Sequence, residues 1–109
     1  MRRRTEDLHG FDVLTGLDFA LVRVREAYEN GYDEIELKHG AADVHERASE
    51  GRGRIKWGLR DLLESGRLDR WARRGESWPR AASLVVALKR NPSPRPEIWS
   101  PSPRRAHRR

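Results

Sequence analysis

Apolar residues recur at helical spacing in two stretches of the chain. In residues 17–28 the apolar positions lie three or four apart, which is typical of an amphipathic helix. Thr15 has a side chain of the type that caps a helix N-terminus, and Asn30-Gly31 is a typical helix end. Residues 55–63 repeat the apolar spacing. The sequence therefore predicts two helices, each with one apolar face.

Apolar residues alternate with charged ones in residues 34–38, where Ile35 and Leu37 stand between glutamate and lysine side chains. This alternation predicts a strand with one buried face and one solvated face. Residues 81–89 form the most apolar stretch and predict a strand in the centre of the sheet. Leu8 is the strong core residue of a first strand, which we expect over residues 6–9.

A short third strand is expected around Leu68 and Trp71, whereas Trp78-Pro79 is expected in a turn or loop. A sheet with one solvated face needs helices on its other face only, and 109 residues suffice for one small domain. We therefore expect an α/β (α+β) two-layer sandwich in the order βαβαββ, with a mixed four-stranded sheet and two helices on one face.

Composition divides the chain into three parts. Residues 1–4 are interpreted as a basic N-terminal extension, and residues 5–90 as the folded domain. Residues 91–109 hold five of the six prolines and five arginines, which is typical of an extended or disordered tail. Within this tail, Ile98-Trp99 could pack onto the domain or stack on a nucleic-acid base.

The chain contains no cysteine, which excludes a disulfide framework and a thiolate metal site. It also contains no apolar run of the length that a membrane span or a signal-peptide core requires. We therefore expect a cytoplasmic protein without a membrane partner.

Charges of opposite sign are segregated along the sequence. Residues 5–50 hold four basic and twelve acidic side chains, whereas residues 51–90 hold eleven basic and four acidic ones. A concentration of basic residues favours a surface that meets polyanions, so we expect nucleic acid, DNA or RNA, as the partner. In the alternative interpretation the charges pair across the domain or are solvated.

Two histidine-glycine pairs contain the candidate catalytic residues. His9-Gly10 follows the first predicted strand, and His39-Gly40 follows the second. If these strands run parallel and side by side, both histidines lie at one edge of the sheet. Asp7 is two residues before His9, on the same face of an extended segment, and could orient the imidazole.

A basic, glycine-containing segment precedes the second predicted helix. It comprises Gly51, Arg52, Gly53, Arg54 and Lys56. The backbone N–H groups of a helix start carry positive partial charge, and basic side chains beside them suit a phosphate. We therefore expect these residues, with Gly10 and Gly40, to contact the nucleic-acid phosphates.

The chain resembles the small MutS-related (Smr) domain family over residues 5–90. Residues 6–10, Glu-Asp-Leu-His-Gly, resemble the Leu-Asp-Leu-His-Gly motif of that family, and His39-Gly40 resembles its later His-Gly-x-Gly motif. The chain departs from the family pattern at Glu6, where an apolar residue is common, and at Ala42, where the second glycine is usual. It also has a shortened approach to the last strand, in residues 77–82.

The resemblance implies a fold similar to the C-terminal domain of bacterial translation initiation factor three. It further implies nucleic-acid binding, with DNA nicking or RNA cleavage in several members and action in DNA repair or on ribosomes. In our hypothesis His9 is a general acid or base oriented by Asp7, and His39 is its partner. The basic residues at the helix start would stabilise charge on the phosphate.

Three alternatives stay open. A divalent metal, zinc or manganese, could bind Asp7, His9, His39 and His45, although no tight ligand spacing supports such a site and no cofactor is evident. The chain could hold DNA or structured RNA without cleaving it. It could also be a protein-interaction module of ribosomes or repair complexes, in which case the acidic half would matter more than the basic half.

Overall fold

The structure is a computed structural model in which residues 1–40 and 54–104 are described. In these residues the elements follow in the predicted order. They are β1 (Arg3–Asp7), α1 (Val13–Glu29), β2 (Glu34–Lys38), α2 (Arg54–Glu64), the 3-10 helix η1 (Arg74–Glu76), β3 (Trp78–Pro79) and β4 (Ser83–Ala87). The predicted positions Gly51, Arg52, Gly53 and His45 lie outside the described residues.

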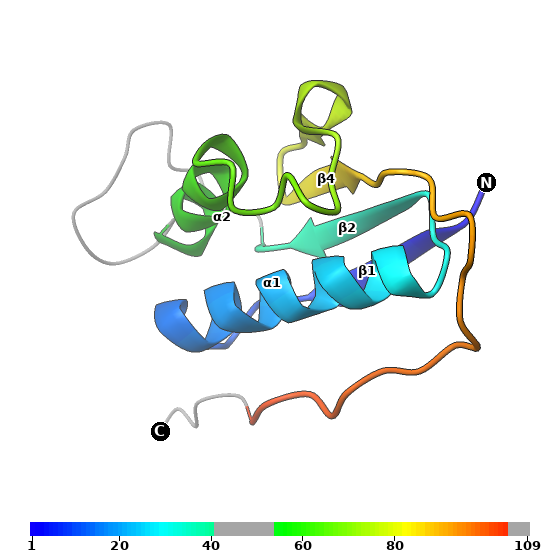
Figure 1. The fold of residues 1–109 in the computed structure, drawn as a ribbon. Coiled ribbons are helices and arrows are strands. Elements are labelled where there is room, and N and C mark those ends of the chain that lie inside the picture. Colours follow the sequence, from blue (N-terminus) through cyan, green and yellow to red (C-terminus); the bar gives the residue numbers. More distant parts are fainter. Residues whose placement is uncertain (41–53, 105–109) are drawn as a thin grey trace.

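The strands form one mixed four-stranded sheet in the order β1-β2-β4-β3. β1 and β2 are parallel, and β4 is antiparallel to both of its neighbours. The two helices and the sheet form the two layers of a small sandwich, as predicted (Figure 1).

The core lies between the helices and one face of the sheet. Ile35 and Leu37 of β2 are completely buried there, opposite Val86 and Leu84 of β4. The helices contribute apolar residues at the spacing that the sequence predicts: Phe19, Ala20, Val24 and Ala27 from α1, and Leu59, Leu62 and Leu63 from α2. The alternation along the strands therefore fixes which sheet face the helices cover.

The other sheet face carries the alternate, charged residues. Glu36 of β2 accepts a hydrogen bond from the Ser83 hydroxyl at 2.6 Å and forms an ion pair with Arg80 at 3.3 Å. Arg3 of β1 pairs with Glu34 of β2 on this face. Polar side chains that bond to one another can cover a sheet face without a second helical layer.

β1 begins earlier than the sequence predicts, at Arg3. Residues Arg3 and Arg4 therefore belong to the sheet and not to a basic extension before it. The physical reason is pairing with β2, because Arg3 and Arg4 are in register with Glu34 and Ile35.

The third strand does not lie at Leu68 and Trp71, so this prediction is wrong. These residues form turns after α2, in which Trp71 and Ala72 donate backbone hydrogen bonds to the Leu68 carbonyl at 2.9 and 2.8 Å. The apolar positions 68, 71 and 72 have the spacing of a helical turn, and Leu68 and Ala72 are buried as such. The strand is Trp78–Pro79, and the proline is tolerated because β3 is an edge strand.

The sequence predicts the C-terminal end of α1 correctly but not its N-cap residue. The N-cap is Asp12 and not Thr15, since the Asp12 carboxylate accepts a hydrogen bond from the Thr15 backbone N–H at 3.3 Å. The predicted end at Asn30 is confirmed. Neither described helix is long and apolar enough to cross a lipid bilayer.

Residues 91–104 run back along the outer side of α1 (Figure 1). The sequence predicts an extended or disordered tail here, and the described part is extended but docked. Trp99 packs against the core and meets the Tyr32 ring edge to face, with ring centroids 5.5 Å apart. Of the pair Ile98-Trp99, Trp99 packs onto the domain, whereas the Ile98 side chain is exposed.

Candidate functional site

The two histidine-glycine pairs meet at one edge of the sheet. Asp7, the last residue of β1, is in register with Lys38, the last residue of β2, and the Leu8 N–H donates to the Lys38 carbonyl at 2.8 Å. A Cβ atom built on Gly40 would lie 3.5 Å from Cδ2 of His9, so the His9 ring rests against the second turn. The parallel pairing therefore brings together the two candidates that the sequence singled out. We call this place the histidine edge: His9, Gly10, His39 and Gly40.

Both turns of the histidine edge require glycine. Gly10 and Gly40 have φ angles of +91° and +92°, a backbone region that is costly for any residue with a Cβ atom. The chain can therefore leave both strands sharply, directly after each histidine.

Asp7 fixes the first turn. Its Oδ1 atom accepts a hydrogen bond from the backbone N–H of His9 at 2.9 Å. This hydrogen bond sets the path of the chain that carries His9. The sequence-based hypothesis that Asp7 orients the His9 imidazole stays a prediction.

The two histidines differ in environment. The His9 side chain is exposed, whereas that of His39 is half-buried. Burial lowers the pKa of His39 below its ordinary value of 6.5, and the positive charges of Lys56 and Arg60 lower it further. The Nδ1 atom of His39 lies 2.9 Å from the Gly40 carbonyl oxygen, an arrangement in which Nδ1 carries the proton and donates. Both effects favour the neutral form of the His39 imidazole.

The start of α2 supplies positive charge to this edge. Arg54 is its first residue, and Lys56 and Arg60 act electrostatically on His39. Both cations also contact Trp57: the Lys56 Nζ and Arg60 Cζ atoms lie 5.2 and 4.9 Å from the centroid of its ring. The sequence analysis did not single out Arg60 or Trp57. The sequence signal that could have identified Arg60 was its spacing from Lys56. The two residues are four apart and thus lie on one helix face.

Three chain segments are packed together behind the histidine edge. A Cβ atom built on Gly16 of α1 would lie 3.5 Å from both the Phe11 Cβ and the Ile55 Cδ1 atoms. Phe11 directly follows His9-Gly10, and Ile55 is in the first turn of α2. The close approach that Gly16 allows therefore holds the first turn, the start of α1 and the start of α2 in one arrangement.

Many of the other basic residues are in ion pairs. Arg73 pairs with Glu76, and Arg74 with Asp69, both within the segment between α2 and β3. In residues 5–50, Glu6 of β1 and Glu26 of α1 pair with Arg23. Glu34 and Glu36 of β2 pair with Arg3. The ion pair of Arg80 with Glu36 joins residues 51–90 to residues 5–50, so pairing between the two oppositely charged parts of the chain occurs at that position.

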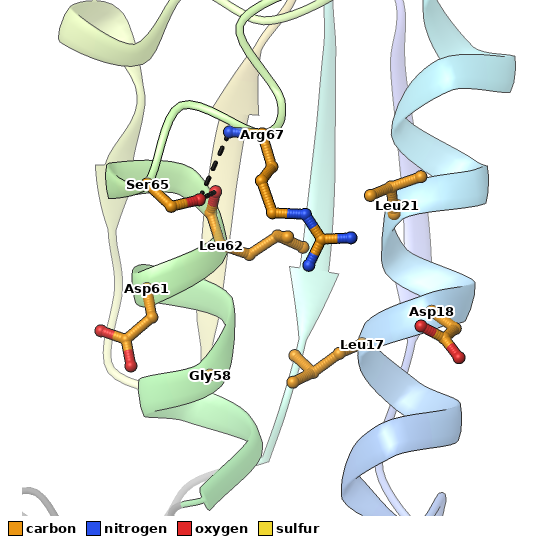
Figure 2. Close-up of a pocket in the computed structure, with 8 residues that line it drawn as sticks. All are labelled: Leu17, Asp18, Leu21, Gly58, Asp61, Leu62, Ser65 and Arg67. Atoms are coloured by element: carbon orange, nitrogen blue, oxygen red, sulfur yellow. Dashed lines mark hydrogen bonds between the residues drawn. The ribbon is translucent and has the colours of Figure 1, made fainter.

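A hollow between α1 and α2 is separate from the predicted site residues. Leu17, Leu21 and Leu62 form its apolar part, and the Arg67 side chain points between the two helices (Figure 2). None of the predicted site residues that the structure describes lines it. In residues 1–40 and 54–104, no three His, Cys, Asp or Glu side chains gather in a group that could hold a metal ion.

Comparison with known proteins found no match among family models, curated proteins or solved structures.

Proposed function

We propose that this chain binds nucleic acid at the histidine edge and cleaves a phosphodiester bond there, as the resemblance to the Smr domain implies. The observation that carries the proposal is the closeness of the His9 ring to Gly40, beside the half-buried His39, whose pKa is lowered, and the cations of α2. Two imidazoles can supply the base and the acid that phosphodiester cleavage uses, and positive charge beside them can stabilise the phosphate.

The proposed reaction assigns one proton transfer to each histidine. His39, whose lowered pKa favours the form that can accept a proton, takes the proton of the attacking hydroxyl or water as a new P–O bond forms. His9 gives a proton to the leaving oxygen as the old P–O bond breaks. Lys56 and Arg60 stabilise the negative charge that accumulates on the phosphate, and the backbone N–H groups at the start of α2 add to this effect. We place the activity in the cytoplasm, in DNA repair or on ribosomes.

A second candidate is a module that binds nucleic acid without cleaving it. It is favoured by the hydrogen bonds of the histidine edge itself, because Asp7 bonds to the His9 backbone and His39 bonds to the Gly40 carbonyl. Side chains used in this way could serve the turns alone. Binding would then depend on the cations and the helix start.

A cleavage assay separates the two candidates. Labelled single-stranded RNA, duplex DNA and branched DNA are incubated with the wild type and His9→Ala at one salt concentration, with and without EDTA. We expect His9→Ala to cleave about 10²–10⁴-fold more slowly, the usual contribution of a general acid or base, while its Kd stays within about twofold.

The charge contribution is tested with the double variant Lys56→Gln/Arg60→Gln and the control Arg73→Gln, whose side chain pairs with Glu76 instead. We expect weaker binding for the double variant only. Equal cleavage rates for wild type and His9→Ala would refute the catalytic assignment. Binding without cleavage by the wild type would favour the second candidate, and loss of cleavage in EDTA would favour a metal.

A further inference from the structure

An exposed tryptophan lies on the sheet face that the helices leave uncovered. Trp78 of β3 is in register with Val85 of β4. Leu84 and Val86, which flank Val85 in the sequence, belong to the core under the helices. Val85 and its cross-strand partner Trp78 therefore lie on the opposite face. Trp78 is 41% exposed, so its aromatic side chain is accessible on this face.

Two basic side chains lie on the same face, nearer to the histidine edge. Lys38 is exposed, ends β2 directly before His39 and is in register with Ser83 of β4. The Arg80 N–H, just after β3, donates to the Ser83 carbonyl at 2.8 Å. The Arg80 side chain is 53% exposed and reaches Glu36, two residues before Lys38 and on the same face of β2. We call Lys38, Trp78 and Arg80 the open-face group.

The acidic residues of this face are already engaged. Glu34 and Glu36 both pair with Arg3 of β1, and Asp7 accepts the backbone hydrogen bond that fixes the first turn. Within residues 1–40 and 54–104, no carboxylate forms an ion pair with Lys38. The ammonium group of Lys38 is therefore available to an anionic ligand that approaches along this face.

The open-face group continues outward from the histidine edge. β3 is two strand spacings away from β2, and Trp78 is level with Glu36, two residues further from the edge than Lys38. These spacings place the Cα atoms of Lys38 and Trp78 about 12 Å apart. A stacked single strand covers such a distance with about three or four nucleotides, at about 3.4 Å each.

We propose that the open-face group binds a single-stranded stretch of the nucleic acid that enters the histidine edge, with a base stacked on Trp78 and phosphates at Lys38 and Arg80. The inference rests on the proposed function of that edge and adds the substrate class to it. A base stacks on a side-chain ring only when it is not held in a duplex, so the ring selects unpaired strands. The two cations add affinity without sequence specificity.

The first test removes the aromatic ring and keeps the strand. Trp78→Val retains an apolar residue that favours β-structure, and Trp78→Phe retains a ring as the matched control. Kd is measured by fluorescence anisotropy for a labelled single strand and for its duplex with the complementary strand, as RNA and as DNA. Circular dichroism verifies that both variants are folded.

We expect Trp78→Val to bind the single strand about 5- to 150-fold more weakly, the range for the loss of one stacked base, and to bind the duplex within about twofold of wild type. Trp78→Phe should recover most of the single-strand affinity. Wild-type Kd for the single strand in folded Trp78→Val would overturn the inference, and so would equal losses for single strand and duplex. A wild type that binds neither form would refute the proposed function itself, which is a different result.

The second test removes the charges and does not depend on Trp78. Lys38→Gln/Arg80→Gln is compared with Lys89→Gln/Arg90→Gln, which loses the same net charge beyond the far end of β4, opposite to the histidine edge. We expect the open-face variant to flatten the slope of log K against log salt for the single strand by about 1.4, since each phosphate contact contributes about 0.7. The control variant should keep the wild-type slope. Equal slopes for the open-face variant and wild type would overturn the inference.

Discussion

Glycine sets the geometry of the histidine edge at the residue scale. The positive φ angles of Gly10 and Gly40 let each parallel strand turn directly after a histidine, so that both imidazoles stay at the sheet edge. The sequence predicts this part correctly, because a glycine after a strand permits a tight exit. What the sequence did not show is that the His9 ring rests on Gly40, a contact between two turns thirty residues apart.

Gly40→Ala should lower the free energy of unfolding by about 1–2 kcal/mol, the cost of a left-handed conformation for a residue with a Cβ atom. The new Cβ would meet His9 at 3.5 Å, an ordinary contact, so the cost comes from the backbone. Urea denaturation measures the change. Gly75→Ala is the control, because no atom lies within 4 Å of its Cβ position, and a change within about 0.5 kcal/mol is expected. Equal effects at the two positions would contradict the explanation.

A buried charge group joins three segments at the element scale. Glu6 of β1 and Glu26 of α1 flank Arg23, and Ser100 completes the group; it lies in residues 91–103, the C-terminal segment that we call the strap. Glu6 faces α1, and a buried arginine there requires a negative partner. Arg23 is not among the apolar positions that predict this helix, so the sequence carried no signal for its burial.

Arg23→Ala should destabilise the protein by about 3–5 kcal/mol, because the buried Glu26 would lose its arginine partner and Glu6 would lose one of its two arginines, keeping Arg4. Chemical denaturation measures the loss. The exposed pair of Arg73 and Glu76 provides the control, and Arg73→Ala should cost less than about 1 kcal/mol. The double variant Glu6→Leu/Arg23→Met should recover part of the stability, since apolar groups can replace a buried ion pair. Similar losses for Arg23→Ala and Arg73→Ala would show that burial of this charge is unimportant.

The strap is part of the fold at the scale of the whole molecule. Proline and arginine content predicts an extended or disordered tail. Residues 91–104 are extended, and their hydrogen bonds to α1 reach its C-terminal half, from Arg23 to the C-cap Asn30. Trp99 is partly buried and packs against the hydrophobic core. The folded unit therefore continues past the last strand.

A chain that ends at Arg90 should be less stable than the full chain by at least about 2 kcal/mol, because it loses the Trp99 packing and the hydrogen bonds to Arg23 and Glu26. Thermal unfolding followed by circular dichroism measures the difference. A chain that ends at Arg104 keeps every contact described for the strap and should melt with the full chain. Equal melting temperatures for all three would mean that the strap contributes nothing to folding.

The sequence by itself determined the two-layer sandwich and the place of each histidine-glycine pair directly after a strand. These features follow from local periods of 2 and 3.6 residues and from glycine at strand ends, which are properties of short segments. The sequence left open the parallel pairing of β1 with β2, which brings the two pairs together. Only the tertiary structure decided the place of the third strand, the burial of Arg23 and the course of the strap. Each depends on partners distant in the sequence: β4 for Trp78–Pro79, Glu6 for Arg23 and α1 for Ser100. Charged residues and proline-rich segments have no periodic sequence pattern that indicates such a distant partner. Their burial is therefore seen only in the folded structure.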